Sequence, residues 1–146
     1  MIVRIDHVGI IAHSWDEAGN VLLDKMGFDL DAGRTRIPEG NFFAPENTDI
    51  WFVKVMLGET RIEVLVPRDD KSGIGRRLSK YGPGLHHIGY GSTDPAADAK
   101  VFRENGLEQI DLKSGGRGDL PGSETPFFYP RSAGGILTEI VPARDD

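Results

Sequence analysis

The sequence predicts an α+β fold in which two βαβββ modules form an open, curved sheet around a central cleft. Three features predict it. A Val- and Ile-rich segment followed by a capped helical segment occurs twice. The stretch IDHVGI at 5–10 reappears as LHHIGY at 85–90. Each half also ends in an apolar strand, RIEVLVP or LTEIVP, which contains one glutamate and stops at proline.

The first half gives the module its element order. VRIDHVGIIA at 3–12 is typical of a strand, and a helix is expected over 14–27, with Ser14 as N-cap and Gly27 at its end. Strands are expected at 28–37, 49–57 and 61–67. The Gly- and Pro-rich residues 36–48 read as a long loop, a kind of segment that is often functional.

The second half follows the same order. A strand over 86–91 precedes a helix that Thr93 or Asp94 caps and Gly106 ends, with Pro95 in its first turn. Strands are expected at 107–113, 126–130 and 137–142, and a loop at 113–125. We therefore expect a single domain over 1–146, with module one at 1–68, a linker at 69–83 and module two at 84–146. A short helix is expected at 74–81 in the linker.

Composition narrows the class of protein. The chain has 146 residues, of which 38% are hydrophobic and 27% charged, as in globular domains. No apolar run approaches the roughly 18 residues that span a bilayer, and the first residues lack a secretory cleavage pattern. The net charge of −6, without a basic stripe, argues against nucleic acid. We expect a cytoplasmic protein with a small-molecule partner and neither a membrane nor a nucleic-acid partner.

Four polar residues occupy matching places in the two halves. His7 and His87 lie 80 residues apart in the aligned strands, and Glu63 and Glu139 each follow a glycine by five residues. A carboxylate inside an apolar strand costs several kcal/mol to bury unless a cation or hydrogen bonds compensate it. Two imidazoles and two carboxylates suit Mn, Co, Ni, Zn or Fe as a divalent ion, with positions left for substrate. Without cysteine, the sequence offers no thiolate ligand. We therefore expect the cleft to bind a metal through these residues.

These stretches resemble the vicinal oxygen chelate superfamily of glyoxalases, bleomycin-resistance proteins and dioxygenases, whose paired βαβββ modules hold a metal. Within it the sequence is most similar to the methylmalonyl-CoA epimerase family, in IDHVGI at 5–10, GLHHIGY at 84–90, YPRSAGGILTEIV at 129–141 and the linker SGIGRRLSKYGPGLHHI at 72–88. By this resemblance the metal ligands are His7, Glu63, His87 and Glu139. The same His, Glu, His, Glu pattern also resembles bacterial glyoxalase I.

The leading hypothesis is a metal-dependent epimerase or isomerase that acts on a carbonyl compound, such as an acyl-CoA thioester, through an enolate. Glu139 or Glu63 would be the base. Three alternatives stay open. One is a glyoxalase I-like lyase, and another is a non-haem Fe(II) dioxygenase with His7, His87 and Glu139 as its facial triad. The third is a small-molecule binding or resistance protein.

One departure from the epimerase family bears on the substrate. The resemblance implies a carboxylate base on the strand at 49–57, and this stretch contains Val53 and Lys54 but no glutamate. The two long loops also differ from that family. They favour a different substrate, with Phe42, Phe43 and Phe127 as an apolar wall. The superfamily often assembles its modules across subunits, so a homodimer is compatible with the resemblance.

Overall fold

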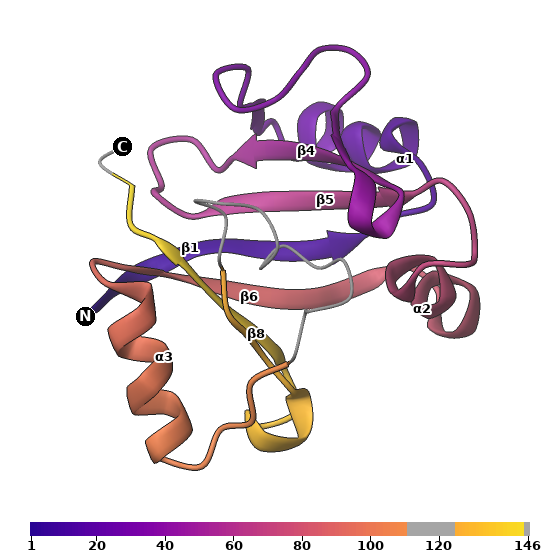
Figure 1. Cartoon of the computed structure of the whole chain (residues 1–146). Helices are drawn as coiled ribbons and strands as arrows, with labels where there is room; N and C mark the ends of the chain where they lie inside the picture. Colours follow the sequence, from indigo (N-terminus) through magenta and orange to yellow (C-terminus); the bar gives the residue numbers. More distant parts are fainter. Residues whose placement is uncertain (111–124, 145–146) are drawn as a thin grey trace. The chain divides into compact units, whose positions relative to one another are not determined.

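The structure is a computed structural model that describes residues 1–110 and 125–144 (Figure 1). The chain forms two compact units. The first consists of Met1–His7 and His86–Asp146, and the second of Val8–Leu85. The first strand, β1 (Ile2–Ile11), starts in one unit and ends in the other. The expected single domain and its module boundaries remain predictions.

The second unit contains a sheet in the order β2, β4, β5, β1, with β3 also paired to β4. These strands are β2 (Asp29–Leu30), β3 (Asn41–Phe43), β4 (Thr48–Lys54) and β5 (Arg61–Pro67). The antiparallel register of β4 and β5 places Phe52 opposite Glu63. The expected strand at 61–67 is confirmed with the same bounds.

Helices cover both faces of this sheet. On one face, Ala18 of α1 (Trp15–Gly19) and Leu22 of the π-helical turn η1 (Asn20–Lys25) pack against Trp51 and Val64. The other face packs against α2 (Gly73–Tyr81), whose Ile74 joins a cluster with Ile11, Ile50 and Leu65. Because strand side chains alternate between faces, Glu63 shares the face of Leu65.

The expected strand at 28–37 is wrong in length, because only Asp29–Leu30 pairs with β4. Beyond it, one more backbone hydrogen bond joins the two segments, from the Asp31 amide to the Phe52 carbonyl at 2.8 Å, and side-chain contacts follow. The Thr35 hydroxyl accepts a hydrogen bond from the Phe52 amide at 3.0 Å, and Asp31 forms a buried ion pair with Arg61 at 2.8 Å. The expected loop at 36–48 was also incomplete, since it contains β3 and the 3₁₀ turn η2 (Ala44–Glu46).

The first unit contains strands in the order β1, β6, β8, β7. They are β6 (Gly84–Ser92), β8 (Leu137–Pro142) and β7 (Phe127–Phe128), with the 3₁₀ turn η4 (Pro130–Ser132) before β8. β6 and β8 run parallel, and the register pairs Gly89 with Glu139. Helix α3 (Pro95–Glu104) covers one face, where Ala99 packs against Phe128 and Ile140.

The expected strand at 107–113 is reduced, in its described residues, to a bridge between Gln109 and Phe128. The expected strand at 137–142 is confirmed, and that at 126–130 is shortened to β7. The expected loop at 113–125 lies outside the described residues except for Thr125.

Both expected helix starts are confirmed by their caps. The Ser14 hydroxyl accepts a hydrogen bond from the Glu17 amide at 3.1 Å, and the Asp94 carboxylate accepts one from the Ala97 amide at 3.2 Å. The linker helix is also confirmed and begins one residue earlier than expected, with Ser72 as its N-cap.

None of the helices in the described residues is long and apolar enough to cross a membrane. The α+β fold class is confirmed.

Candidate metal centre

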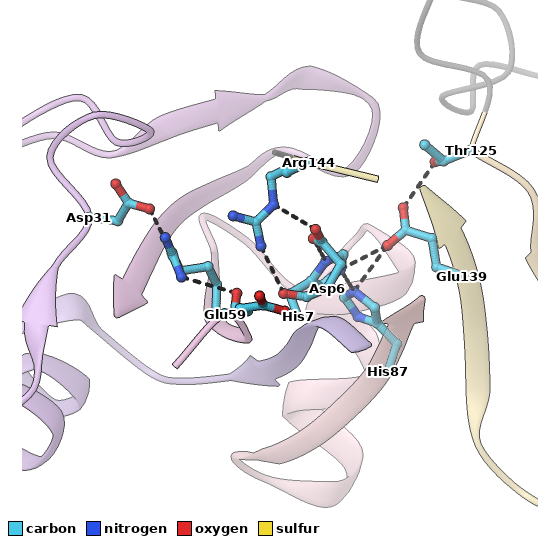
Figure 2. Close-up of polar contacts among 9 residues, drawn as sticks. Asp6, His7, Asp31, Glu59, His87, Thr125, Glu139 and Arg144 are labelled. Carbon is cyan, nitrogen blue, oxygen red and sulfur yellow. Dashed lines mark hydrogen bonds and ion pairs between the residues drawn. The ribbon is translucent and has the colours of Figure 1, made fainter. Parts of the chain in front are cut away.

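Three of the four expected ligands meet in the first unit (Figure 2). His7 comes from β1, His87 from β6 and Glu139 from β8. His7 Nε2 lies 2.9 Å from both His87 Nε2 and Glu139 Oε1, and His87 Nε2 lies 3.4 Å from Glu139 Oε1. All three side chains are buried, and Glu139 is 0% exposed. One nitrogen of each histidine and one carboxylate oxygen therefore converge on one point.

The strand register explains this convergence. Glu139 alternates with Thr138 and Ile140, and Ile140 packs in the cluster beneath α3, so Glu139 projects from the opposite face. Gly89 of β6 is the Cα partner of Glu139 and leaves space for an imidazole. A Cβ atom at Gly89 would lie 2.2 Å from Cε1 of His7. Only glycine at this position allows the His7 ring to lie where it does.

A buried carboxylate orients His7. Asp6 Oδ2 lies 2.8 Å from His7 Nδ1, and Asp6 Oδ1 accepts a hydrogen bond from Arg144 Nε at 2.6 Å. Burial raises the pKa of Asp6, but the hydrogen bonds to His7 and Arg144 outweigh it and bring the pKa below its ordinary value. Asp6 is therefore ionised near neutral pH, and it favours the tautomer with the proton on Nδ1 and a lone pair on Nε2.

The other two side chains also have neighbours that fix their orientation. His87 Nδ1 lies 2.8 Å from Nδ1 of the half-buried His86, and the ring of Phe127 lies 6.1 Å from the ring of His87. The Thr125 hydroxyl donates a hydrogen bond to Glu139 Oε2 at 2.9 Å. Glu139 is thus held by one oxygen, and its other oxygen faces the histidines. Phe127 therefore borders the group, and its role in an apolar wall for the substrate stays a prediction.

Glu63 belongs to the second unit. It lies in β5, is 3% exposed and shares a face of the sheet with Arg61 and Leu65. This is the face opposite α1, just as Glu139 lies opposite α3 in its own unit, so the repeat places both glutamates equivalently. Its role as fourth ligand or base stays a prediction. Phe42 and Phe43 also lie in the second unit, where Phe42 is half exposed and stacks under the Arg68 guanidinium.

The donor set fits a divalent cation. Two imidazole nitrogens and a carboxylate oxygen face one another at contact distance, and their lone pairs would repel without a positive charge or a proton between them. Two histidines and one carboxylate are a common ligand set for Fe, Mn, Co, Ni and Zn, and they leave coordination positions for substrate.

Four supporting residues were not identified from the sequence: Asp6, Gly89, Thr125 and Arg144. Gly89 carried a signal, because it repeats Gly9 in the aligned strands. Asp6 precedes His7, but neighbouring strand residues point to opposite faces, and so its contact with the imidazole was not expected. Thr125 and Arg144 lie in segments without a regular pattern.

The structure also shows which side chains β4 carries beside Glu63, on the strand where the resemblance to the epimerase family implies a carboxylate base. In β4, the side chains on the face of Glu63 are those of Ile50, Phe52 and Lys54, since Phe52 is the direct partner of Glu63. The single carboxylate of β4, Asp49, lies on the opposite face and is ion-paired with Arg68 at 2.9 Å. Within β4, therefore, no carboxylate accompanies Glu63.

The fold and the three-residue group agree with a match to a family model. Residues 6–120 match the model of the glyoxalase/bleomycin resistance protein/dioxygenase superfamily. The chain belongs to this superfamily, as its sequence indicated.

Within the superfamily, the chain is similar to methylmalonyl-CoA epimerases. It is 28% identical over 142 residues to the mitochondrial methylmalonyl-CoA epimerase of Dictyostelium discoideum, covering 95% of this chain and 78% of that one. It is 23% identical over 143 residues to the uncharacterized protein YqjC of Bacillus subtilis, covering 98% and 94% of the two chains. A solved structure of a Streptomyces coelicolor methylmalonyl-CoA epimerase variant, in complex with 2-nitronate-propionyl-CoA, matches with a TM-score of 0.78. It is 26% identical, and the match covers 98% of this chain and 99% of that one.

Proposed function

We propose that the protein is a metal-dependent epimerase or isomerase that moves a proton at the carbon next to the carbonyl of an acyl-CoA thioester. The observation that carries the proposal is the buried meeting of His7, His87 and Glu139. The similarity to methylmalonyl-CoA epimerases, one of them in complex with an acyl-CoA analogue, supports the substrate class.

The three side chains would hold the cation through the atoms that already face one another. A divalent cation supplies positive charge beside a carbonyl oxygen, which lowers the cost of removing a proton from the adjacent carbon. Asp6 keeps the His7 lone pair directed at the centre, and Thr125 holds the outer oxygen of Glu139. Burial strengthens these contacts because water competes less for them.

Proton transfer is assigned to Glu63. Both oxygens of Glu139 have contacts within the centre, Oε1 with the histidines and Oε2 with Thr125, so Glu139 is better suited to hold a cation than to exchange protons. Glu63 is its counterpart in the other half of the repeat. In this proposal Glu63 takes the proton from carbon as the enolate forms and returns it to the same face, so that inversion needs a proton delivered to the other face.

The substrate is proposed to differ from methylmalonyl-CoA. The face of β4 beside Glu63 carries Ile50, Phe52 and Lys54, so this strand has no second carboxylate there. With a single carboxylate, exchange of a proton with solvent is expected to be efficient, whereas delivery of the proton to the opposite face is expected to be slower than in an enzyme with two bases.

Deuterium incorporation tests the proposal. The purified protein is loaded with Co²⁺, Ni²⁺, Mn²⁺, Zn²⁺ or Fe²⁺ and incubated in D₂O with a panel of acyl-CoA thioesters and 2-oxo compounds. We expect metal-dependent deuteration next to the carbonyl of at least one thioester, and loss of both bound metal and exchange in Glu139→Gln. The control Glu104→Gln removes an exposed carboxylate of α3 and should change neither. Exchange that survives chelation would refute the mechanism.

A second function is favoured by the ligand set itself. Two histidines and one carboxylate with open positions are typical of non-haem Fe(II) oxygenases. Oxygen uptake that requires added Fe²⁺ and a substrate, without deuterium exchange, would favour a dioxygenase over the isomerase.

A further inference from the structure

Behind the metal centre, a chain of contacts links Arg144, two residues after β8, to the buried Asp6 and His7. Arg144 Nε donates to Asp6 Oδ1 at 2.6 Å, and Arg144 Nη2 donates to the Asp6 carbonyl oxygen at 3.1 Å. The other carboxylate oxygen of Asp6 lies 2.8 Å from His7 Nδ1. Figure 2 shows Asp6 between the two side chains. Each oxygen of the Asp6 carboxylate thus has a separate partner.

Arg144 fixes Asp6 in two ways. A guanidinium that binds both the side chain and the main chain of one residue restricts it more than a single contact does, because its donors have a fixed planar geometry. It also compensates a carboxylate that is 2% exposed, and an uncompensated buried charge is costly. The Arg144 carbonyl in turn accepts a hydrogen bond from Arg4 of β1.

The consequence reaches the metal centre through the His7 ring. Partners of the outer nitrogen of a metal-binding histidine set its tautomer, orientation and basicity. Here that partner is Asp6, and Asp6 takes its own orientation from Arg144. The segment 137–144 therefore supplies the ligand Glu139 directly and supports the ligand His7 indirectly.

We propose that Arg144 is a positioning residue that sets the metal affinity of the centre through Asp6 and His7. This inference rests on the metal centre proposed above. Arg144 lies five residues beyond Glu139, outside the four expected ligands and their matching stretches.

A double-mutant cycle on metal affinity tests the inference. The metal-free protein and the variants Arg144→Gln, Asp6→Asn and the double variant are titrated with Co²⁺ against a competing chelator. We expect Asp6→Asn to weaken binding about 10- to 100-fold and Arg144→Gln about 10-fold. Because Arg144 acts through Asp6, the double variant should bind no more weakly than Asp6→Asn alone.

The visible spectrum of the Co²⁺-loaded protein gives a second readout, since it reports ligand geometry rather than overall stability. It should change in Arg144→Gln and be partly restored in Arg144→Lys, which keeps the charge but loses the planar pair of donors. The control Arg131→Gln removes an arginine of the same unit that pairs with Glu108 on the surface at 2.7 Å. It should leave both affinity and spectrum unchanged.

The outcomes separate this inference from the proposed function. If the wild-type protein binds no divalent cation, both fail. If the wild type binds Co²⁺ and Arg144→Gln binds it equally well with the same spectrum, only the role of Arg144 fails. If the losses of metal affinity in the two single variants add fully in the double variant, the role of Arg144 is also overturned. If Arg144→Gln does not fold, as judged by circular dichroism, Arg144→Lys and Asp6→Asn provide the same comparison.

Discussion

At the scale of single residues, the metal centre needs room for the His7 ring as well as the three ligand side chains. His7 can face His87 and Glu139 because position 89 has no side chain. A methyl group there would overlap the imidazole, and neither the ring nor the buried strand behind it has room to move without disturbing other contacts.

We therefore predict that Gly89→Ala displaces His7 and lowers divalent-metal affinity by at least about tenfold, as measured by competition titration. The control is Gly33→Ala in the second unit, where a Cβ atom would make only an ordinary contact, at 3.6 Å from Asp31 Oδ1. Unchanged affinity in Gly89→Ala would contradict the geometry of the site.

The sequence predicted three residues that the structure brings together. A carboxylate inside an apolar strand needs a cation or hydrogen bonds, and here it recurs with a histidine at equivalent places of both halves. The sequence did not predict the residues that orient the three. Asp6 contacts His7 although the two are adjacent on a strand, and Thr125 and Arg144 come from irregular segments. Such contacts depend on side-chain geometry in three dimensions, which hydrophobic periodicity does not encode.

At the scale of elements, local signals determined most boundaries. The helix starts at Ser14 and Asp94 follow from capping residues, and β5 and β8 follow from apolar runs that stop at proline. The strand at 28–37 is shorter than predicted: its composition suits a strand, but after Leu30 the side chains of Asp31 and Thr35 contact β5 and β4 in place of a regular backbone ladder.

The cap of α3 gives a prediction about stability. Asp94→Ala removes the acceptor for the Ala97 amide and should lower the free energy of unfolding by about 1 kcal/mol, as measured by urea denaturation. Asp94→Ser keeps a capping oxygen and should retain most of that stability. Equal losses in the two variants would show that the cap is not the cause.

The start of α3 also gives a prediction about pH. Hydrogen bonds from the Ser92 hydroxyl and the N-terminal amine lower the pKa of Asp98 below its ordinary value of 3.8. A carboxylate whose folded-state pKa is lowered stabilises the protein above the unfolded-state value, and this contribution is lost as the pH falls through the folded-state pKa.

Ser92→Ala should therefore raise the pKa of Asp98 toward its ordinary value in an NMR titration and reduce the loss of stability on acidification. Ser132→Ala, which removes a hydroxyl elsewhere in the same unit, should leave the Asp98 titration unchanged. An Asp98 pKa that is the same in the wild type and in Ser92→Ala would refute the assignment.

At the scale of the whole molecule, the repeat relates the two units. Each has a glutamate on the sheet face opposite its own helix, Glu139 opposite α3 and Glu63 opposite α1. The two histidines, however, belong to the same unit, because β1 contributes its first residues there. The sequence predicted matching halves, but it did not predict that His7 and His87 share one unit. The packing of β1 decides this.

Metal binding should stabilise the protein by mass action. At a free metal concentration about 100 times Kd, binding to the folded state alone adds about 2.7 kcal/mol to the free energy of unfolding. Hydrogen exchange should show slower exchange in β6 and β8 when metal is added. If Glu63 is the fourth ligand, exchange should also slow in β5. Protection confined to the first unit would remove Glu63 from the ligand set.

The most direct test of the centre is an anomalous difference map from crystals of the metal-loaded protein. We predict one strong peak about 2.0–2.2 Å from Nε2 of His7, Nε2 of His87 and Oε1 of Glu139. A peak bound by other residues, or crystals soaked in Co²⁺ that show none at these three atoms, would contradict it.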